Sequence, residues 1–292
     1  MDRIGKYVIH KVSVTSGYAQ VVFCSDPDLQ VPVAIKLFDP RRVNESPLSP
    51  AQWLGRFVFE ARGLAMVDHT YVTPVKSLEQ LPDGRPYFVM PYFAAHLAYE
   101  IGHDSPSELD GPKRLSLARS ILLLRQLSAA LASMHRKGMV HRWVKPSNIL
   151  LTAKEGGAVR LADFSMVKFP GNTNPPLPDI WSDRGPYVAP EQLENASGVG
   201  PQADVYSLGA LAYRLTTGKV PLSGLATLEP TPDMPEELWD LISQAMDPDP
   251  GKRPVNAGLM LSRFEGVPLD SRAKSVEKVS TAKRRTRTSV AT

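Results

Sequence analysis

The sequence contains a single cysteine, Cys24, among its 292 residues. No intramolecular disulfide can form, so we expect a reducing compartment. No apolar run approaches the roughly 18 residues of a membrane span, and the N-terminus MDRIGKYVIHK lacks the apolar core of a secretory signal. These absences predict a cytoplasmic protein, or the cytoplasmic domain of a longer membrane-associated one. A hydrophobic content of 42% indicates a globular chain with one large domain or two packed lobes.

Outside the C-terminal tail, acidic residues slightly outnumber basic ones. The formal net charge is +4, but residues 271–292 carry seven Lys or Arg residues and one Glu, which leaves −2 for residues 1–270. Any argument for an acidic partner therefore concerns the tail alone. The tail has almost nothing apolar to bury, and we expect it to be disordered. A solvated charge run is the simplest interpretation, and contact with anionic lipid is the alternative. Nucleic acid is not expected, because no aromatic residue lies among these charges.

The first third of the chain is predicted to be mostly strand. Clusters of β-branched and aromatic residues over 7–38 predict a three-stranded antiparallel meander. Helical periodicity follows at 56–67. Two further strands, 73–81 and 85–93, flank the turn Pro82-Asp83-Gly84. We therefore expect a small lobe with a five-stranded antiparallel sheet and one helix.

The remainder is predicted to be mainly helical. Apolar stripes favour helices at 115–138, 204–218 and 235–246, and the first two end at a glycine. Residues 170–186 are too rich in Pro, Asn and Gly for regular structure, so we expect a long surface segment there. The predicted fold class is α+β with two lobes. The expected parts are a small lobe at 1–93, a larger lobe at 94–269 and the tail at 270–292.

Short motifs follow one another in a specific order along the chain. They are VAIK (33–36), RFVFEA (56–61), PYFVMPYF (86–93), HRWVKPSN (141–148), ADFS (162–165), APE (189–191), Asp204 and DPGKRP (249–254). In this order they resemble the motifs of a protein kinase of the bacterial Ser/Thr type, over about residues 7–265. Each motif alone would be weak, but the complete series predicts a kinase-like fold.

The resemblance implies a site for ATP and Mg²⁺. Lys36 matches the lysine that holds the α- and β-phosphates, and Glu60 matches its helix partner. Asn148 and Asp163 match the two oxygen ligands of the metal. Lys145 matches the lysine that neutralises the γ-phosphate.

The resemblance also implies a place for adenine. With Met90 as the gatekeeper, the carbonyl of Pro91 and the amide of Phe93 would bind the base. Proline lacks only a donor that this position does not use. Ala34 and Leu150 would form the apolar roof and floor of the slot.

Other matches are implied to be structural. Asp204 matches the aspartate that tethers the backbone of the catalytic loop, and Arg253 matches the arginine that pairs with Glu191. His141 is expected to be a core histidine that braces the loop. Lys36 with Glu60 has a structural interpretation as well, since an ion pair would hold the helix against the strand. Asn148 and Asp163 could equally be residues that cap their own loops.

Three departures weaken the implied chemistry. Trp143 stands where a kinase has its catalytic aspartate, and an indole offers no acceptor and no useful pKa. The glycine-rich pattern falls on VTSGYAQV, so its glycines are replaced by Val14, Ser16 and Ala19, and a Cβ keeps the backbone away from phosphates. Ser165 replaces the glycine that would let Asp163 move.

The sequence therefore predicts a pseudokinase that acts as a signalling or scaffold module, with weak ATP and Mg²⁺ binding. One alternative is an active phosphotransferase or nucleotidyl transferase with a relocated base. A second is an adaptor that binds no nucleotide. Thr286 and Thr288 lie beside arginines, so the expected partners are an active kinase acting on the tail and a phosphothreonine-reading domain. Membrane contact is expected only through the tail.

Overall fold

The computed structural model describes residues 3–15, 18–39, 48–102, 104, 113–171, 185–221 and 228–269. Several predictions concern residues outside these ranges. They are the greater part of the predicted surface segment, Ser16 of the glycine-rich pattern, and the whole tail with Thr286 and Thr288.

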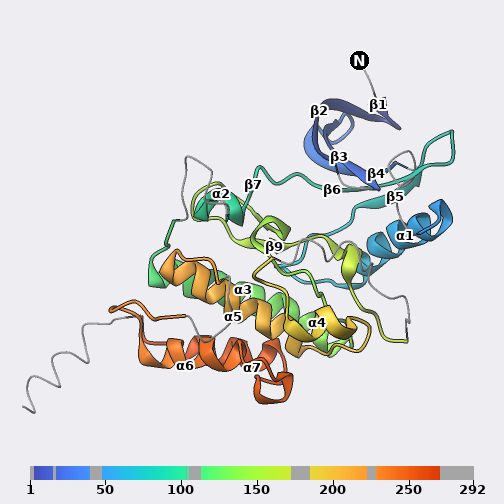
Figure 1. Ribbon diagram of the computed structural model, residues 1–292. Coiled ribbons are helices and arrows are strands. Elements are labelled where there is room, and N and C mark those ends of the chain that lie inside the picture. Colours follow the sequence, from blue (N-terminus) through green and yellow to red (C-terminus); the bar gives the residue numbers. More distant parts are fainter. Residues whose placement is uncertain are drawn as a thin grey trace, which may run out of the picture.

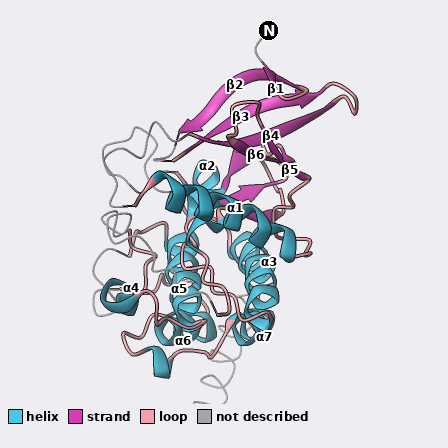
Figure 2. Cartoon of the chain, turned by 90° about the vertical axis from the view of Figure 1, so that its right-hand side faces the viewer, coloured by secondary structure: helices cyan, strands magenta, loops and turns pink. Residues whose placement is uncertain are grey.

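The chain forms two lobes, as the sequence predicted (Figures 1 and 2). Figure 2 shows the small lobe as a curled sheet that lies above a larger, mainly helical lobe. The strands of the small lobe are β1 (Arg3–Ile4), β2 (Tyr7–Thr15), β3 (Ala19–Asp26), β4 (Val31–Phe38), β5 (Ser77–Gln80) and β6 (Pro86–Pro91), and its helix is α1 (Pro50–Met66). The α+β, two-lobed fold class is thus confirmed.

The sheet has six strands in the order β1-β2-β3-β4-β6-β5, and each pair of neighbouring strands is antiparallel. The prediction of five strands was wrong by one. The sixth strand, β1, has only two residues and pairs Arg3 with Val8 and Ile4 with Tyr7. A two-residue strand is too short for a period-2 pattern to reveal it.

The alternation of β4 determines which side chains face the site. Val33, Ile35 and Leu37 pack into an apolar cluster on one face of the sheet. Ala34, Lys36 and Phe38 therefore lie on the other face, which α1 covers. Phe57 of α1 contacts Phe38 and Phe88 there, with ring centroids 5.7 and 5.3 Å apart.

The large lobe is built around two buried helices. Its elements are β7 (Ala95–His96), α2 (Leu97–Ile101), α3 (Leu117–Arg136), β8 (Ile149–Leu151), β9 (Val159–Leu161), α4 (Pro190–Asn195), α5 (Gln202–Thr217), α6 (Glu236–Ala245) and α7 (Ala257–Glu265). Strands β7, β8 and β9 form a second, three-stranded sheet. The apolar stripe of α3 is buried at Ile121, Leu124 and Leu131, and α5 is buried along nearly its whole length.

The predicted boundary between the lobes, at residues 93 and 94, falls between β6 and β7. The chain passes from the sheet of one lobe into the sheet of the other at this point. Among the residues described, no helix is both long enough and apolar enough to cross a bilayer.

Candidate functional site

The candidate nucleotide site lies where the two lobes meet. Its residues come from β4, α1, the end of β6, the loop between α3 and β8, and the segment that follows β9. We call Lys36, Glu60 and Asp163 the lysine end of the site. We call Ala34, Pro91, Phe93 and Leu150 the hinge end.

Lys36 and Glu60 form a buried ion pair, as predicted. The Nζ atom of Lys36 donates to both carboxylate oxygens of Glu60, at 2.7 and 2.9 Å. Burial alone would lower the pKa of Lys36, but the negative charges of Glu60 and Asp163 outweigh it and raise that pKa above its ordinary value. The lysine therefore remains charged, and α1 is fixed against β4.

Tyr18 completes the lysine end, and sequence reasoning did not identify it. Its hydroxyl donates to Oε2 of Glu60 at 2.9 Å and accepts from Nζ of Lys36 at 3.3 Å. Its ring stacks on Trp53, with centroids 4.6 Å apart and an interplanar angle of 17°. Tyr18 is only 6% exposed, and burial raises the pKa of its hydroxyl above the usual range.

Asp163 lies beside this cluster and is held by its neighbour. Its Oδ1 is 3.8 Å from Nζ of Lys36 and accepts a 2.6 Å hydrogen bond from Oγ of Ser165. Burial alone would raise the pKa of Asp163, but Lys36 and Ser165 outweigh it and hold that pKa below its ordinary value. A glycine at residue 165 could not make this side-chain contact, so the serine adds a restraint on Asp163.

His141 braces the catalytic loop from the core, as expected. The backbone N–H of Trp143 donates to Nδ1 of His141 at 3.2 Å, so that ring nitrogen must be an acceptor. The other nitrogen, Nε2, therefore carries the proton and donates to the carbonyl of Ala162 at 3.2 Å. Burial lowers the pKa of His141, which favours this neutral form.

Asp204 of α5 tethers the same loop, as predicted. Its two carboxylate oxygens accept from the backbone N–H groups of His141 and Arg142, at 2.8 and 2.7 Å. The ring of His135 provides a third contact at 2.9 Å. Burial alone would raise the pKa of Asp204, but the contacts with His135 and His141 outweigh it and lower that pKa.

Trp143 occupies the position of the expected base and engages its own neighbours. The indole packs against the small cluster of Met166 and Ala196. The Nζ atom of Lys145 lies 4.7 Å from the centre of the indole ring, which is within the range of a cation–π interaction. Trp143 and Lys145 also line a small, open pocket together with Tyr187.

Asn148 is close to the same loop. Its amide nitrogen donates to the carbonyl of Trp143 at 2.9 Å, which leaves the amide oxygen as the atom that could face a metal. Asn148 and Asp163 together fit a partial Mg²⁺ site, since both supply hard oxygen ligands. Among the described residues there is no group of three or more His, Cys, Asp or Glu side chains that could hold a metal ion without help from a ligand.

Three of the four residues predicted to form an adenine slot lie on strands β4, β6 and β8. Ala34 pairs with Met90 in the β4–β6 ladder, and Leu150 lies on β8. Leu150 is half-buried and Ala34 is buried. Pro91 is the last residue of β6, and Phe93 lies two residues beyond it, outside that strand. The adenine slot formed by these four residues stays a prediction.

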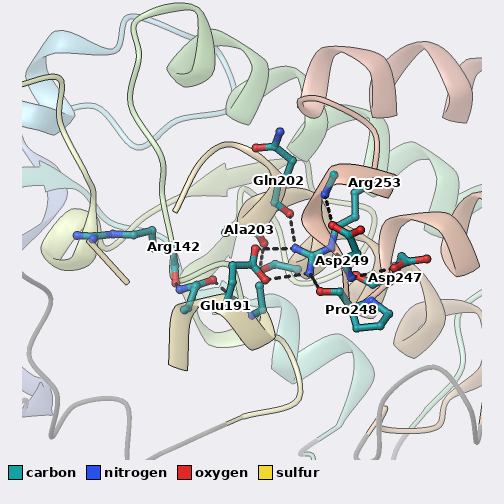
Figure 3. A network of polar contacts seen from close by, with 12 residues as sticks. Arg142, Glu191, Gln202, Ala203, Asp247, Pro248, Asp249 and Arg253 are labelled. Carbon is teal, nitrogen blue, oxygen red and sulfur yellow. Dashed lines mark hydrogen bonds and ion pairs between the residues drawn. The ribbon is translucent and has the colours of Figure 1, made fainter. Parts of the chain in front are cut away.

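Glu191 and Arg253 form the predicted structural pair (Figure 3). The Arg253 guanidinium donates to both oxygens of Glu191, at 2.7 and 2.9 Å. It also donates to the carbonyls of Asp247, Gln202 and Pro248. Gln192, next to Glu191, donates to the carbonyl of Arg142 at 3.0 Å, which links this network to the catalytic loop.

A second buried arginine was not predicted. Arg214 of α5 is fully buried and pairs with Asp104 through its Nε, at 2.8 Å. Its terminal nitrogens donate to backbone carbonyls at Ile101, Gly102, Lys113 and Gly218. The hydroxyl of Tyr187 donates to the same Asp104, at 2.9 Å. The sequence offered no signal for this network, because Asp104 lies 83 residues from Tyr187 and 110 residues from Arg214.

Comparison with known proteins agrees with this geometry. The protein kinase domain family matches residues 15–264. The chain is 32% identical over 228 residues to serine/threonine-protein kinase PknL of Mycobacterium tuberculosis. This alignment covers 76% of this chain and 52% of that protein. It is 30% identical over 271 residues to serine/threonine-protein kinase PknA of the same species, with coverage of 87% and 59%. The chain thus spans little more than half the length of these relatives.

Proposed function

The chain belongs to the protein kinase family, with residues 15–264 matching the kinase domain. We propose that it is a pseudokinase. In this proposal the kinase-like lobes act as a signalling or scaffold module through binding. The nucleotide site has little or no phosphotransfer activity, and its affinity for ATP with Mg²⁺ is weak. We place it in the cytoplasm, which accords with its single buried cysteine.

One observation carries the proposal: the indole of Trp143 stands at the position of the catalytic base and is covered by Lys145. Losing a general base reduces a rate by about 10²- to 10⁴-fold. The lysine expected to neutralise the γ-phosphate is also engaged, because its ammonium lies over the indole face. One substitution thus affects both the acceptor hydroxyl and the transferred phosphate.

Two further observations support weak nucleotide binding. Ser165 restrains Asp163 through a hydrogen bond. The hydroxyl of Tyr18 accepts a hydrogen bond from the ammonium of Lys36. Phosphoryl transfer depends on positioning, and a displacement of about 1 Å can reduce a rate on the order of 10²-fold. These features act on the same transition state as the missing base. The adaptor that binds no nucleotide is the extreme case of this proposal.

The rival function is an active phosphotransferase whose base comes from elsewhere. It is favoured by the intact ion pair of Lys36 with Glu60 and by the names of the relatives, which are serine/threonine-protein kinases. An ion pair of this kind also has a structural role, since it holds α1 against β4. It therefore does not by itself argue for catalysis.

A phosphotransfer assay separates the two functions. The chain is incubated with radiolabelled ATP and Mg²⁺ or Mn²⁺, with generic acceptor proteins, and labelling of both chain and acceptor is followed. We expect no stoichiometric labelling. Stoichiometric labelling that is lost in Asp163→Asn would overturn the pseudokinase proposal in favour of an enzyme. Transfer of the nucleotide moiety, followed with α-labelled ATP, would identify a nucleotidyl transferase.

We also propose that the basic tail is the segment that is modified and bound during signalling. An active kinase would modify Thr286 or Thr288, and a phosphothreonine-reading partner would then dock. A phosphate adds a charge of about −1.5 to −2 at pH 7, so it changes the local charge of this cationic segment strongly. Partner binding that is unaltered after deletion of 271–292 would remove this part of the proposal.

A further inference from the structure

The ammonium of Lys36 has no proton left for a phosphate. It carries three N–H donors. Two of them are directed at the oxygens of Glu60, and the third is directed at the hydroxyl of Tyr18. Lys36 is only 8% exposed. An incoming triphosphate would therefore have to displace a partner from this lysine before it could bind.

Tyr18 is the partner that can be displaced, since Glu60 belongs to the middle of α1. The tyrosine ring lies 5.2 Å from Nζ of Lys36, close enough for a cation–π contact. It is held on its other side by the stacked ring of Trp53. Its carbonyl accepts from the backbone N–H of Asp39 at 2.9 Å. Side chain and backbone thus both hold the ring over the lysine end.

The hinge end is separate from this arrangement. Ala34 and Lys36 lie on the same face of β4, two residues apart, which corresponds to about 7 Å along a strand. Ala34, Met90 and Leu150 make none of the hydrogen bonds or ring contacts found for Tyr18, which involve Lys36, Glu60, Asp39 and Trp53. A ligand confined to the hinge end could therefore bind while Tyr18 stays in place.

We propose that Tyr18 occupies the phosphate-binding half of the site, so that the site binds an adenine nucleoside in preference to ATP. The inference rests on the proposed function, in which this site binds a ligand without transferring its phosphate. Adenosine would use the Pro91 carbonyl, the Phe93 amide and the apolar contacts of Ala34 and Leu150. ATP would bind only to the fraction of molecules in which Tyr18 has left the lysine, and its apparent affinity falls by that fraction.

The test is calorimetric titration of the full chain with adenosine and with ATP–Mg²⁺. We expect the wild type to bind adenosine at least as tightly as ATP. Tyr18→Ala should lower the Kd for ATP at least about tenfold, because the closed state no longer competes. It should leave the Kd for adenosine within about threefold.

Two hydroxyl variants provide a matched comparison. Tyr18→Phe keeps the ring and the stack but releases one donor of Lys36, so we expect a smaller gain in ATP affinity than with alanine. Tyr87→Phe is the control, because it removes a hydroxyl that also donates to a carboxylate, Glu79, at 2.5 Å. Tyr87 belongs to the cluster on the opposite face of the sheet. Its substitution should change neither affinity. Tyr18→Phe also provides the test if the alanine variant fails to fold.

Three results would overturn the inference. They are a wild-type chain that binds ATP about tenfold or more tightly than adenosine, a chain that binds no adenosine, and Tyr18 variants without a gain in ATP affinity. Tight ATP binding with no phosphotransfer would refute the role of Tyr18 and the weak ATP affinity of the proposed function, and would leave its lack of phosphotransfer standing. Stoichiometric phosphotransfer would refute the pseudokinase proposal itself.

Discussion

At the scale of single residues, the environment of Trp143 is suited to an indole and not to a carboxylate. Its ring packs against Met166 and Ala196, and the ammonium of Lys145 lies on its face. An aspartate at residue 143 would be shorter, would lose these apolar contacts and would carry a charge into a half-buried place. A buried charge is unfavourable unless it is paired.

We therefore predict that Trp143→Asp does not produce a useful kinase. The restored carboxylate leaves the restraint on Asp163 and the contacts of Tyr18 unchanged. Single-turnover transfer should therefore stay far below the rate typical of kinases, which is about 1 s⁻¹ or more. The variant should also be less stable by about 1–3 kcal/mol in urea unfolding. Trp143→Phe, which keeps an aromatic ring, should lose less.

The comparison variant combines Trp143→Asp with glycine at residues 14, 16 and 19. If the degenerate phosphate loop is part of the defect, this variant should be faster than the single substitution. Turnover typical of kinases from Trp143→Asp alone would show that the missing base is the only defect.

Asp204 gives the molecule a predictable dependence on acid. Because the pKa of Asp204 is lowered in the folded state, its contribution is fully present above the unfolded value of about 3.9 and is lost as the pH falls through the folded value. Asp204→Asn should lower the free energy of unfolding at pH 7 by about 3 kcal/mol. The reason is geometric, since an amide NH₂ must then face the N–H of His141 or of Arg142.

The measurement is urea unfolding of both proteins across a series of pH values. The stability difference between wild type and Asp204→Asn should be constant near neutrality and shrink below about pH 4. Glu194→Gln is the control, because Glu194 is an exposed carboxylate on the nearby helix α4. A difference for Asp204→Asn that does not change with pH would contradict the assignment of a lowered pKa.

At the scale of secondary-structure elements, a glycine sets the distance between α1 and the segment after β9. A Cβ added to Gly63 would lie far too close to the ring of Phe169. That ring also meets Phe59 of the same helix, with centroids 4.2 Å apart. The helix that carries Glu60 can therefore pack this closely on Phe169 only because residue 63 has no side chain.

Two glycines on this helix allow a matched prediction. Gly63→Ala should destabilise the protein by about 1–3 kcal/mol, since Phe169 or α1 must move. Gly55→Ala should stabilise it by up to about 1 kcal/mol, because Gly55 is exposed, its Cβ would meet nothing within 4 Å and alanine favours helix. Both are measured by thermal and urea unfolding. Equal effects of the two substitutions would contradict the close fit at Phe169.

The elements themselves were predictable to different degrees. The apolar stripe of α3 and the glycine at residue 218 located two helices to within a few residues. The start of α1 was predicted six residues too late, at 56 and not at Pro50. Its N-terminal signal is a capping box in which Ser49 and Gln52 bond to each other's backbone, and the exposed Gly55 interrupts the helical pattern between that signal and residue 56.

At the scale of the whole molecule, the site was predictable where motifs fix it and not where tertiary contacts do. Lys36, Glu60 and Asp163 were found from motif order, and the structure brings them together. Tyr18 was missed because a spacing rule for glycines says nothing about where a neighbouring aromatic ring will pack. The same holds for Arg214, whose partner Asp104 is distant in sequence.

We predict that the tail is dispensable for folding. Residues 271–292 offer almost no apolar area, so their deletion should shift the melting temperature by no more than about 2 °C. The measurement is differential scanning calorimetry of the full chain and of a chain ending at 270, at equal ionic strength. A large decrease would show that the tail packs on the lobes.

The buried pair of Lys36 with Glu60 has a consequence for how this chain can change by mutation. Replacing either residue alone leaves an uncompensated buried charge and is unfavourable by about 3–5 kcal/mol, whereas replacing both with apolar residues can be neutral. The two changes require simultaneous mutations, and the route through either single variant passes through a poorly folded protein. A lineage with no further use for ATP would therefore retain this signature of catalysis for structural reasons. Under the proposed function, loss of activity would be recorded first at positions such as residue 143, where a single mutation is tolerated.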